Sequence, residues 1–261
     1  MATFGNKTRP EKRLMSKWHN GTVVANTRWN ERLTSLKIKA PLENFEPGQF
    51  VRVGLEIDGE IVARPYSLVN TPDESALEIY FNIVPEGPLS PELFELQTGD
   101  DILVAIRPAG FLTISEVPES KNLWMLATGT AIGPFLSILK SQAVWQKFKQ
   151  VTLCYSVRTQ EELVYAQEIS KISEQHPSQF YFIPLITRED APDALQKRIP
   201  QAMENGDLEA RANTPISAED SHVMICGSTE LITEVSTILE SRGMHKHRRR
   251  EPGHFTTEKY H

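Results

Sequence analysis

The 261-residue chain has few cysteines, and none of its apolar runs is long enough to cross a membrane. Its two cysteines, Cys154 and Cys226, are far apart, and each lies inside an apolar run. This spacing excludes a cysteine-based metal site and a disulfide framework, and unpaired thiols are typical of a reducing compartment. Because the N-terminus also lacks the apolar segment of a secretory signal, we expect a cytoplasmic protein with no membrane span and no bound metal.

The chain also lacks the excess of positive charge that is typical of nucleic-acid binders. Its formal net charge is -6, so we expect no nucleic-acid partner. Positive charge is nevertheless concentrated in residues 1–18 and in the segment 245–250. Such clusters usually form solvated faces, but they also suit an acidic protein partner, which they would steer toward the surface.

The two common phosphate-binding motifs are absent as well. The sequence contains no G-x-G-x-x-G fingerprint and no P-loop with its lysine. Instead, a glycine-rich turn at 128–134 connects an apolar run to a helical pattern, and N–H groups at such a helix start attract phosphate. The segment Pro85–Ser90 opens another helix, with Ser90 as the expected N-cap and Pro91 at the first helical position. A tight turn and a capped surface helix are the alternative interpretations of these two segments.

Two patterns of secondary structure divide the chain. Up to residue 114, short apolar runs separated by turns such as Pro47-Gly48 and Asp58-Gly59 predict an antiparallel β-barrel. Beyond it, apolar runs alternate with helical patterns, which predicts an α/β domain with a parallel sheet. We therefore expect an N-terminal extension over 1–18, a barrel domain over 19–114 and an α/β domain over 115–261. The expected strands are 22–25, 33–38, 49–55, 61–70, 77–84, 101–106, 123–127, 151–155, 180–185 and 222–226, and the expected helices are 90–94, 135–147, 161–174, 193–204 and 229–242.

Four residues inside an otherwise apolar strand, Arg64-Pro65-Tyr66-Ser67, suit a ligand with a pyrophosphate and a flat ring. An arginine can pair with a phosphate through two parallel hydrogen bonds. A tyrosine ring can lie against a heterocycle, and a serine hydroxyl can donate to a ring nitrogen or accept from it. Because Pro65 cannot donate to a sheet ladder, we expect the strand at a sheet edge or turning outward there. Taken alone, the four residues also fit an ordinary strand end.

Three arginines, Arg158, Arg188 and Arg198, follow strands of the expected parallel sheet or start the next helix. Ligands of such sheets bind beyond the carboxyl ends of the strands. An arginine cluster there could hold the 2′-phosphate that distinguishes NADP from NAD, although each arginine alone would suit an ordinary surface. Cys226 and Gly227 follow the last strand in the same way, and a buried core cysteine is the alternative interpretation.

In this order and spacing the motifs resemble one family, the bacterial ferredoxin/flavodoxin–NADP+ reductases, from Trp18 to His261. The residues that carry the resemblance are Arg64-Pro65-Tyr66-Ser67, the segments 85–90 and 127–134, Thr187-Arg188, Arg198-Ile199-Pro200, and the segments 222–227 and 249–254. Two departures stand out: Pro88 occupies a position where close relatives carry lysine, and the chain ends in Tyr260-His261 where relatives often end in tryptophan.

The resemblance implies a barrel that binds FAD non-covalently and an α/β domain that binds NADP(H) as a substrate. Arg64 would hold the FAD pyrophosphate, Tyr66 would cover one flavin face, and Ser67 would bond to flavin N5. The implied FAD contacts are Arg64, Pro65, Tyr66, Ser67, Tyr80, Phe81, Asn82, Ile83, Pro88, Leu89, Ser90, Thr130, Thr257, Glu258, Lys259, Tyr260 and His261. The implied NADP contacts are Val157, Arg158, Thr187, Arg188, Arg198, Cys226 and Gly227.

The implied activity is hydride transfer from NADPH to flavin N5, followed by single-electron transfer to ferredoxin or flavodoxin. Tyr66, Ser67 and Glu258 are the implied catalytic residues, and Ser67 and Glu258 are candidates for the accompanying proton movement. Both carriers are acidic, which would give the basic 245–250 segment a docking role.

Two alternatives remain open from the sequence. One is an electron-transfer subunit, although such modules commonly carry four cysteines for a cluster. The other is a non-catalytic nucleotide-binding module, which the presence of two nucleotide sites disfavours. Since no long apolar helix face suggests an obligate dimer, we expect a monomer.

Overall fold

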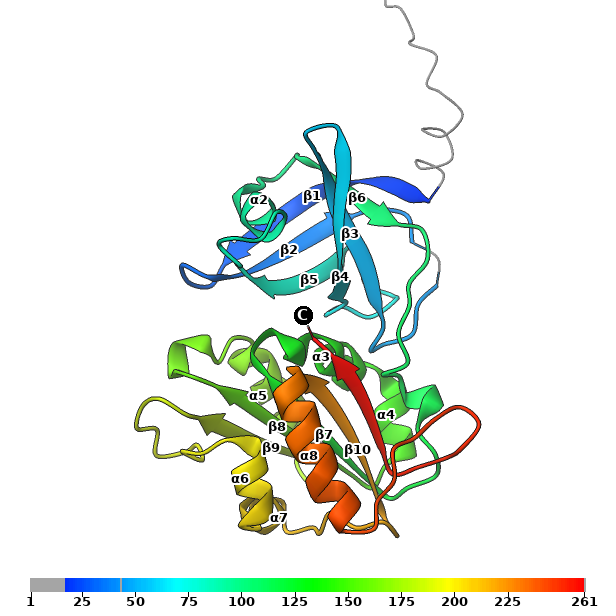
Figure 1. Cartoon of the computed structure of the whole chain (residues 1–261), viewed down its shortest axis with the longest axis vertical. Helices are drawn as coiled ribbons and strands as arrows, with labels where there is room; N and C mark the ends of the chain where they lie inside the picture. Colours follow the sequence, from blue (N-terminus) through cyan, green and yellow to red (C-terminus); the bar gives the residue numbers. More distant parts are fainter. Residues whose placement is uncertain (1–16, 43, 261) are drawn as a thin grey trace, which may run out of the picture. The chain divides into compact units, whose positions relative to one another are not determined.

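The computed structural model describes residues 17–42 and 44–260, which form two compact units (Figure 1). The first unit includes residues 50–109 and the described residues up to 46, and the second combines 47–49 with the chain from 110 onward. The chain thus passes between the units at Ala109–Gly110, whereas the predicted domain boundary lies between 114 and 115. The predicted domain limits stay a prediction, and the predicted extension over 1–18 lies almost wholly outside the described residues.

The first unit is an antiparallel barrel of six strands, as the short alternating runs predict. The sheet order is β4-β3-β6-β1-β2-β5, and an antiparallel bridge between Leu68 and Ile79 joins the end of β4 to β5. The strands are β1 (Trp18–Arg28), β2 (Leu33–Lys39), β3 (Phe50–Ile57), β4 (Glu60–Ser67), β5 (Leu77–Asn82) and β6 (Asp101–Ala105).

Alternate residues of these strands fill the barrel interior, where Val23, Leu36, Val53 and Val104 are fully buried. The barrel's helix, α2 (Ser90–Glu95), adds Leu93 to the same core. The predicted N-cap role of Ser90 is wrong, because Leu89 is the cap residue and Ser90 is the first helical residue. The Ser90 hydroxyl instead accepts a hydrogen bond from the N–H of Val84 at 2.9 Å, which closes the loop before the helix.

The second unit contains a five-stranded parallel sheet in the order β11-β10-β7-β8-β9. All residues of β10 are buried, as are all but the first of β8, which explains their unbroken apolar runs. Among the described residues, no helix has the length and hydropathy needed to cross a membrane. The strands are β7 (Asn122–Thr128), β8 (Gln150–Val157), β9 (Phe180–Ile186), β10 (Ser221–Gly227) and β11 (Phe255–Lys259).

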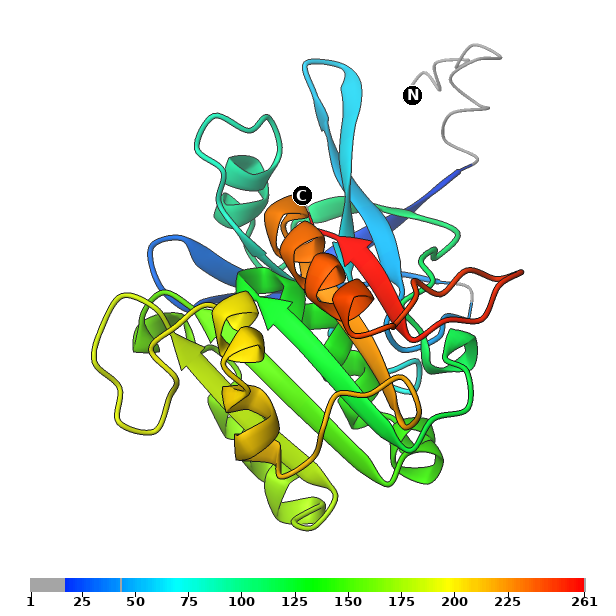
Figure 2. The same cartoon turned by 60° about the horizontal axis from the view of Figure 1, so that its bottom comes forward.

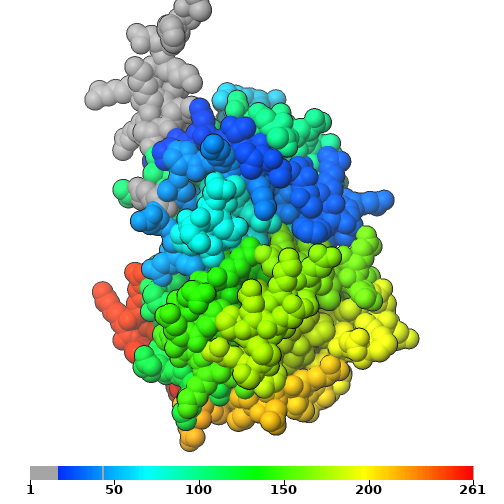
Figure 3. All heavy atoms as spheres, turned by 180° about the vertical axis from the view of Figure 1, so that it is seen from behind, coloured from blue at the N-terminus to red at the C-terminus, as the bar shows by residue number. Residues whose placement is uncertain are grey.

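Helices cover both faces of this sheet. Figure 2 shows α6, α7 and α8 in front of the strands, where they bury Trp124, Ile225 and Phe255 in a common core. The segment with α3, α4 and α5 covers the opposite face, seen in green to yellow-green in the space-filling view of Figure 3. The helices are α3 (Gly133–Lys140), α4 (Gln142–Lys147), α5 (Ala166–Gln175), α6 (Ile199–Glu204), α7 (Asp207–Ala212) and α8 (Thr229–Ser241), with 3-10 turns η1 (Ile114–Glu116), η2 (Gly129–Ile132) and η3 (Gln160–Glu162).

Three details differ from the sequence-based expectation. The predicted helix 135–147 is two helices, because Ser141 is extended and its hydroxyl donates to the carbonyl of Ile138 at 2.7 Å. The predicted helix 193–204 begins only at Ile199, since Pro200 occupies its first turn, where proline starts helices. The short helix α7 and the edge strand β11 do not belong to the predicted elements.

Gly48 provides a test of the packing inside the second unit. Its φ is +102°, and a Cβ atom there would lie 2.0 Å from the carbonyl oxygen of Leu112. Gly99 has the same φ but open space around its Cβ position. Gly99→Ala should therefore cost about 1–2 kcal/mol from backbone strain alone, and Gly48→Ala should cost clearly more because the Leu112 backbone must move.

Urea unfolding of the two variants measures this difference. Equal losses of unfolding free energy for the two variants would contradict the close contact with Leu112.

Candidate functional site

Three of the sequence-predicted segments lie on adjoining elements of the first unit. The bridge between Leu68 and Ile79 sets the end of β4 beside β5, and the Tyr66 ring meets Phe81 edge-on at a centroid distance of 5.4 Å. The hydrogen bond between Val84 and Ser90 ties the end of β5 to the start of α2. The structure thus brings residues 64–67, 80–83 and 88–90 into one region.

Arg64 and Pro65 lie on the edge strand of the barrel sheet, as the proline predicts. Both side chains are exposed. The Arg64 guanidinium donates to the carbonyl of Ala63 at 2.9 Å, and within the described residues it forms no ion pair. Most of its N–H donors therefore remain free for an anion.

Tyr66 and Ser67 are buried next to this arginine, with 8% and 4% of their surfaces exposed. Burial raises the pKa of Tyr66 to about 12, against a smaller lowering by Arg64, so the phenol is neutral at physiological pH. The Ser67 hydroxyl has no hydrogen-bond partner in the part of the chain that the structure describes. A free arginine fork, a neutral phenol and a free hydroxyl together match a pyrophosphate joined to a ring with nitrogen acceptors.

A second group of predicted residues lies at the carboxyl ends of β8 and β9. Val157 is in register with Ile186, Thr187 donates its N–H to Val157 at 3.1 Å, and Arg188 donates its N–H to Arg158 at 2.9 Å. Arg158 and Arg188 therefore occupy neighbouring strand ends with exposed side chains. This is the edge of a parallel sheet at which ligands bind.

The third arginine, Arg198, comes directly before α6 and is also exposed. Its guanidinium contacts two carboxylates of α8, Glu230 at 3.2 Å and Glu234 at 3.3 Å. Sequence reasoning did not identify these two glutamates, because they belong to a different helix and follow no recognisable motif.

The ends of β7 and β10 approach each other closely in the same unit. A Cβ atom on Gly227 would lie 2.6 Å from Oγ1 of Thr128, so a larger residue there would require the Thr128 side chain to move. Gly129 has a φ of +54°, and Thr130 in the following turn is buried. Burial raises the pKa of Cys226 well above its usual value, so its thiol stays protonated and contributes packing rather than nucleophilic character.

The C-terminal residues form β11, which pairs in parallel with β10. Glu258 is in register with Cys226, and the N–H of Tyr260 donates to the carbonyl of Gly227 at 2.8 Å. Burial raises the pKa of Glu258 to about 7, so its carboxyl can gain or lose a proton near neutral pH. His261, another predicted site residue, lies outside the described residues.

Comparisons with known proteins identify the domain families that contain these two groups of candidate site residues. A family model for an oxidoreductase FAD-binding domain matches residues 22–110, and one for an oxidoreductase NAD-binding domain matches residues 125–237. The flavodoxin/ferredoxin–NADP reductase of Escherichia coli is 42% identical over 247 residues, covering 94% of this chain and all of the relative. The ferredoxin–NADP reductase of Pseudomonas aeruginosa is 34% identical, covering 94% and 98%.

A solved structure agrees with these sequences. The crystal structure of a ferredoxin NADP+ reductase from Neisseria gonorrhoeae with bound FAD and NADP has a TM-score of 0.89 and 33% identity, covering 93% of this chain and 98% of that one. The chain belongs to the flavodoxin/ferredoxin–NADP reductase family.

Membership in this reductase family confirms several predictions at once. The two-domain fold class, the oxidoreductase activity and the pairing of an FAD-binding domain with a nicotinamide-nucleotide-binding domain are as the sequence indicates. The donor groups on each unit fit the two nucleotides chemically. The roles of individual residues stay predictions.

The sequence analysis did not predict the hydrogen bonds that several histidines form near β11. His222 on β10 shares a 2.8 Å hydrogen bond with Thr256 on β11, and the Nδ1 atoms of His247 and His254 accept backbone N–H bonds from Gly253 and His245. These bonds shape the segment that leads into β11. Within the described residues, no group of three or more histidine, cysteine or acidic side chains is arranged to hold a metal ion.

His222 makes stability depend on pH. Burial, followed by the charge of His247, lowers its pKa from 6.5 to about 3; Lys147 and His254 act in the same direction, and the Gly253 backbone opposes them. Because the folded pKa lies below the unfolded one, this contribution is complete above about pH 6.5 and is lost as pH falls toward 3. The wild type should lose about 2 kcal/mol more than His222→Gln between pH 7 and 5.

Denaturant titrations at both pH values measure this loss. His19→Gln, on the barrel strand β1, is the matched control and should behave as the wild type does. Parallel pH dependence in the wild type and His222→Gln would disprove the role of His222.

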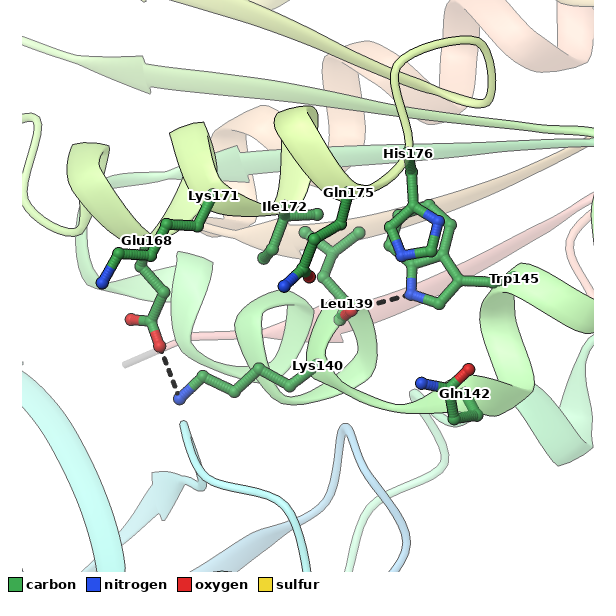
Figure 4. A pocket seen from close by; sticks show the side chains of 9 residues that line it. All are labelled: Leu139, Lys140, Gln142, Trp145, Glu168, Lys171, Ile172, Gln175 and His176. Atoms are coloured by element: carbon green, nitrogen blue, oxygen red, sulfur yellow. Dashed lines mark hydrogen bonds and ion pairs between the residues drawn. The ribbon is translucent and has the colours of Figure 1, made fainter.

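A pocket of about 240 Å³ lies away from all of these residues, between α3 with α4 and α5 (Figure 4). Its wall includes Trp145 and His176, whose rings stack with centroids 3.8 Å apart. An ion pair between Lys140 and Glu168 at 3.0 Å lies at its other end. None of the sequence-predicted site residues lines it.

Proposed function

We propose that the chain is an FAD-dependent reductase that moves electrons between NADPH and a small one-electron carrier, a ferredoxin or a flavodoxin. The observation that carries this proposal is the presence of one suitable set of donors on each unit. The first unit offers a free arginine fork beside a buried phenol and hydroxyl. The second offers arginines at adjacent ends of parallel strands.

In the first unit, Arg64 pairs with the pyrophosphate of FAD. Its guanidinium has only one backbone partner among the described residues, so it can bind two phosphate oxygens without breaking an ion pair. Tyr66 presents a neutral ring to the flavin, and the Ser67 hydroxyl bonds to the flavin nitrogen N5. The remaining FAD contacts are the predicted residues of segments 80–83 and 88–90.

In the second unit, Arg158, Arg188 and Arg198 hold the 2′-phosphate of NADP(H). Val157, Thr187 and Gly227 shape the edge of the sheet, and Gly227 lets the Thr128 side chain approach closely. Cys226 supports this edge from within the core. The guanidinium planes supply the positive charge that selects NADP over NAD.

Bound FAD supplies the redox chemistry, in which it takes a hydride from NADPH and passes on single electrons. The protein orients the nucleotides, and its side chains donate or accept the proton that accompanies flavin reduction. Glu258 is suited to that task because its pKa of about 7 lets it exchange a proton at neutral pH. Ser67 holds the hydrogen bond at N5.

The arginine assignment predicts a change in cofactor selectivity. Arg158→Ala or Arg188→Ala should raise the KM for NADPH by about tenfold or more, because a charge-assisted hydrogen bond contributes about 1.5–3 kcal/mol. The KM for NADH should change little, since NADH lacks the 2′-phosphate. Steady-state kinetics with ferricyanide as electron acceptor measure both values.

Arg211→Ala is the control for this experiment, because Arg211 lies on α7 and bonds to the carbonyl of Asp193. It should leave both KM values unchanged. Equal increases for NADPH and NADH in the Arg158 and Arg188 variants would refute the 2′-phosphate assignment.

The Glu258 assignment predicts a loss of pH dependence. Glu258→Gln should lower turnover by about 100-fold or more, the range for a lost acid–base group. It should also remove the titration near pH 7, where the wild-type carboxyl changes from protonated below to ionised above. Pre-steady-state flavin reduction from pH 5.5 to 8.5 tests this, with Glu240→Gln at an exposed site on α8 as control; a wild-type-like profile in Glu258→Gln would exclude the role.

The basic hairpin, residues 245–251, is the proposed docking element for an acidic carrier. Arg248 and Glu251 pair across it. Arg249 holds Glu116 at 2.9 Å and lies 4.2 Å above the ring of Phe111, which is 56% exposed. Exposed positive charge beside an exposed aromatic ring suits an acidic partner.

We further propose that the protein acts as a monomer in the cytoplasm. The two cysteines are free thiols, which fits a reducing compartment.

The absorption spectrum of the purified full-length protein tests the function as a whole. It should show bound flavin that is bleached by NADPH, and the reduced protein should then reduce an acidic ferredoxin at a rate that falls with rising salt. A colourless protein without NADPH oxidation would indicate a non-catalytic module. Co-elution in a permanent complex with another enzyme would indicate an electron-transfer subunit.

A further inference from the structure

Of the three arginines proposed to bind the 2′-phosphate, Arg198 is already engaged by carboxylates. Glu234 accepts a hydrogen bond from its Nη2 atom at 3.3 Å, and Oε1 of Glu230 lies 3.2 Å from the same nitrogen. The two glutamates are four residues apart on α8, so they share one face of that helix. Arg198 is thus held at one nitrogen by two carboxylates of one helix.

The other two arginines differ from Arg198 in this respect. In residues 17–42 and 44–260, neither the Arg158 nor the Arg188 side chain has a carboxylate partner. Glu162 approaches Arg158 only at the backbone, where it accepts the Arg158 N–H at 3.0 Å. The charge of Arg198 is therefore compensated before any nucleotide arrives, whereas the charges of Arg158 and Arg188 are not.

The position of the contact on the guanidinium matters as much as the charge. An arginine has two edges that offer a pair of parallel N–H donors, one from Nε and Nη2 and one from Nη1 and Nη2. Both edges include Nη2, the atom that the glutamates contact. A phosphate that binds Arg198 by two hydrogen bonds therefore shares Nη2 with the glutamates and competes with their carboxylates for it.

We propose that Glu230 and Glu234 are specificity-determining residues that compete with the 2′-phosphate of NADP for Arg198. The proposal rests on the proposed function, in which Arg198 binds this phosphate. NAD carries no phosphate at that position, so the competition weakens NADP binding alone. The two glutamates thereby reduce the preference for NADP over NAD and favour release of the phosphorylated nucleotide.

The expected effect is moderate because the groups are partly exposed. The side chains of Arg198, Glu230 and Glu234 are 54%, 69% and 37% exposed, and ion pairs of this kind contribute little in water. Loss of one pair should tighten phosphate binding by about two- to fivefold. The effect should shrink at high ionic strength, where exposed charges are screened.

Binding of two nucleotides to the FAD-loaded protein tests the proposal. Adenosine 2′,5′-bisphosphate carries the 2′-phosphate, and adenosine 5′-monophosphate lacks it. For Glu230→Gln/Glu234→Gln, calorimetry at low salt should show about five- to twentyfold tighter binding of the bisphosphate and no change for the monophosphate. Glu240→Gln, an exposed site on the same helix, is the control and should bind both as the wild type does.

Unchanged or weaker bisphosphate binding in the double variant would overturn the proposal, because it would mean that the glutamates only orient Arg198. Equal tightening for both nucleotides would overturn it as well, since the effect would then be one of general charge. Arg198→Ala separates these failures from failure of the proposed function. If Arg198→Ala weakens bisphosphate binding, the arginine assignment stands whatever the glutamates do; if it has no effect, the assignment and the competition fail together.

Discussion

The parallel hydrogen bonding of β7, β8, β9 and β10 is the constraint on which the nucleotide chemistry of the second unit depends. Parallel strands in register end at one edge of the sheet, so Val157 with Ile186 places Arg158 beside Arg188. The same rule brings Thr128 close to Gly227, where an added Cβ atom would lie 2.6 Å from Oγ1 of Thr128. Because β8 and β10 are buried on both faces, the polar groups lie in the loops beyond the ends of the strands.

Burial then adjusts the chemistry of the side chains that this framework positions. Burial raises the pKa of Tyr66 further above neutrality, and it raises the pKa of Glu258 to about 7. Arg64, Arg158 and Arg188 remain exposed and free of carboxylates in the described structure, which keeps their donors available. Arg198 differs from these arginines, because its guanidinium pairs with two carboxylates of α8. Both proposed nucleotide sites therefore combine buried groups with shifted pKa values and exposed cations.

Much of this arrangement could be anticipated from local patterns. The edge position of Pro65, the barrel and the parallel sheet follow from rules that depend on neighbouring residues only. Ser90 was misjudged because its hydroxyl has two possible partners, and contact with Val84 across the loop decides between them. The strand β11 was missed because Thr256, Thr257 and Glu258 have no apolar alternation, and pairing with β10 alone makes them a strand. The hydrogen bonds of His222, His247 and His254 likewise depend on how the segment 245–256 folds back on itself and onto β10.

The sequence by itself determined the fold class, the pairing of an FAD-binding domain with a nicotinamide-nucleotide-binding domain, and the residue types proposed to bind the two nucleotides. Strand periodicity, glycine-rich turns and the ordered arginines are properties of short segments, and short segments can be interpreted without a structure. The tertiary structure alone decided which charged side chains have an opposite charge beside them and which titratable side chains are desolvated. Arg198 meets Glu230 and Glu234 only because α6 and α8 lie on the same face of the sheet. Likewise, burial shifts the pKa values of Glu258 and His222, and desolvation depends on neighbours that are distant in sequence.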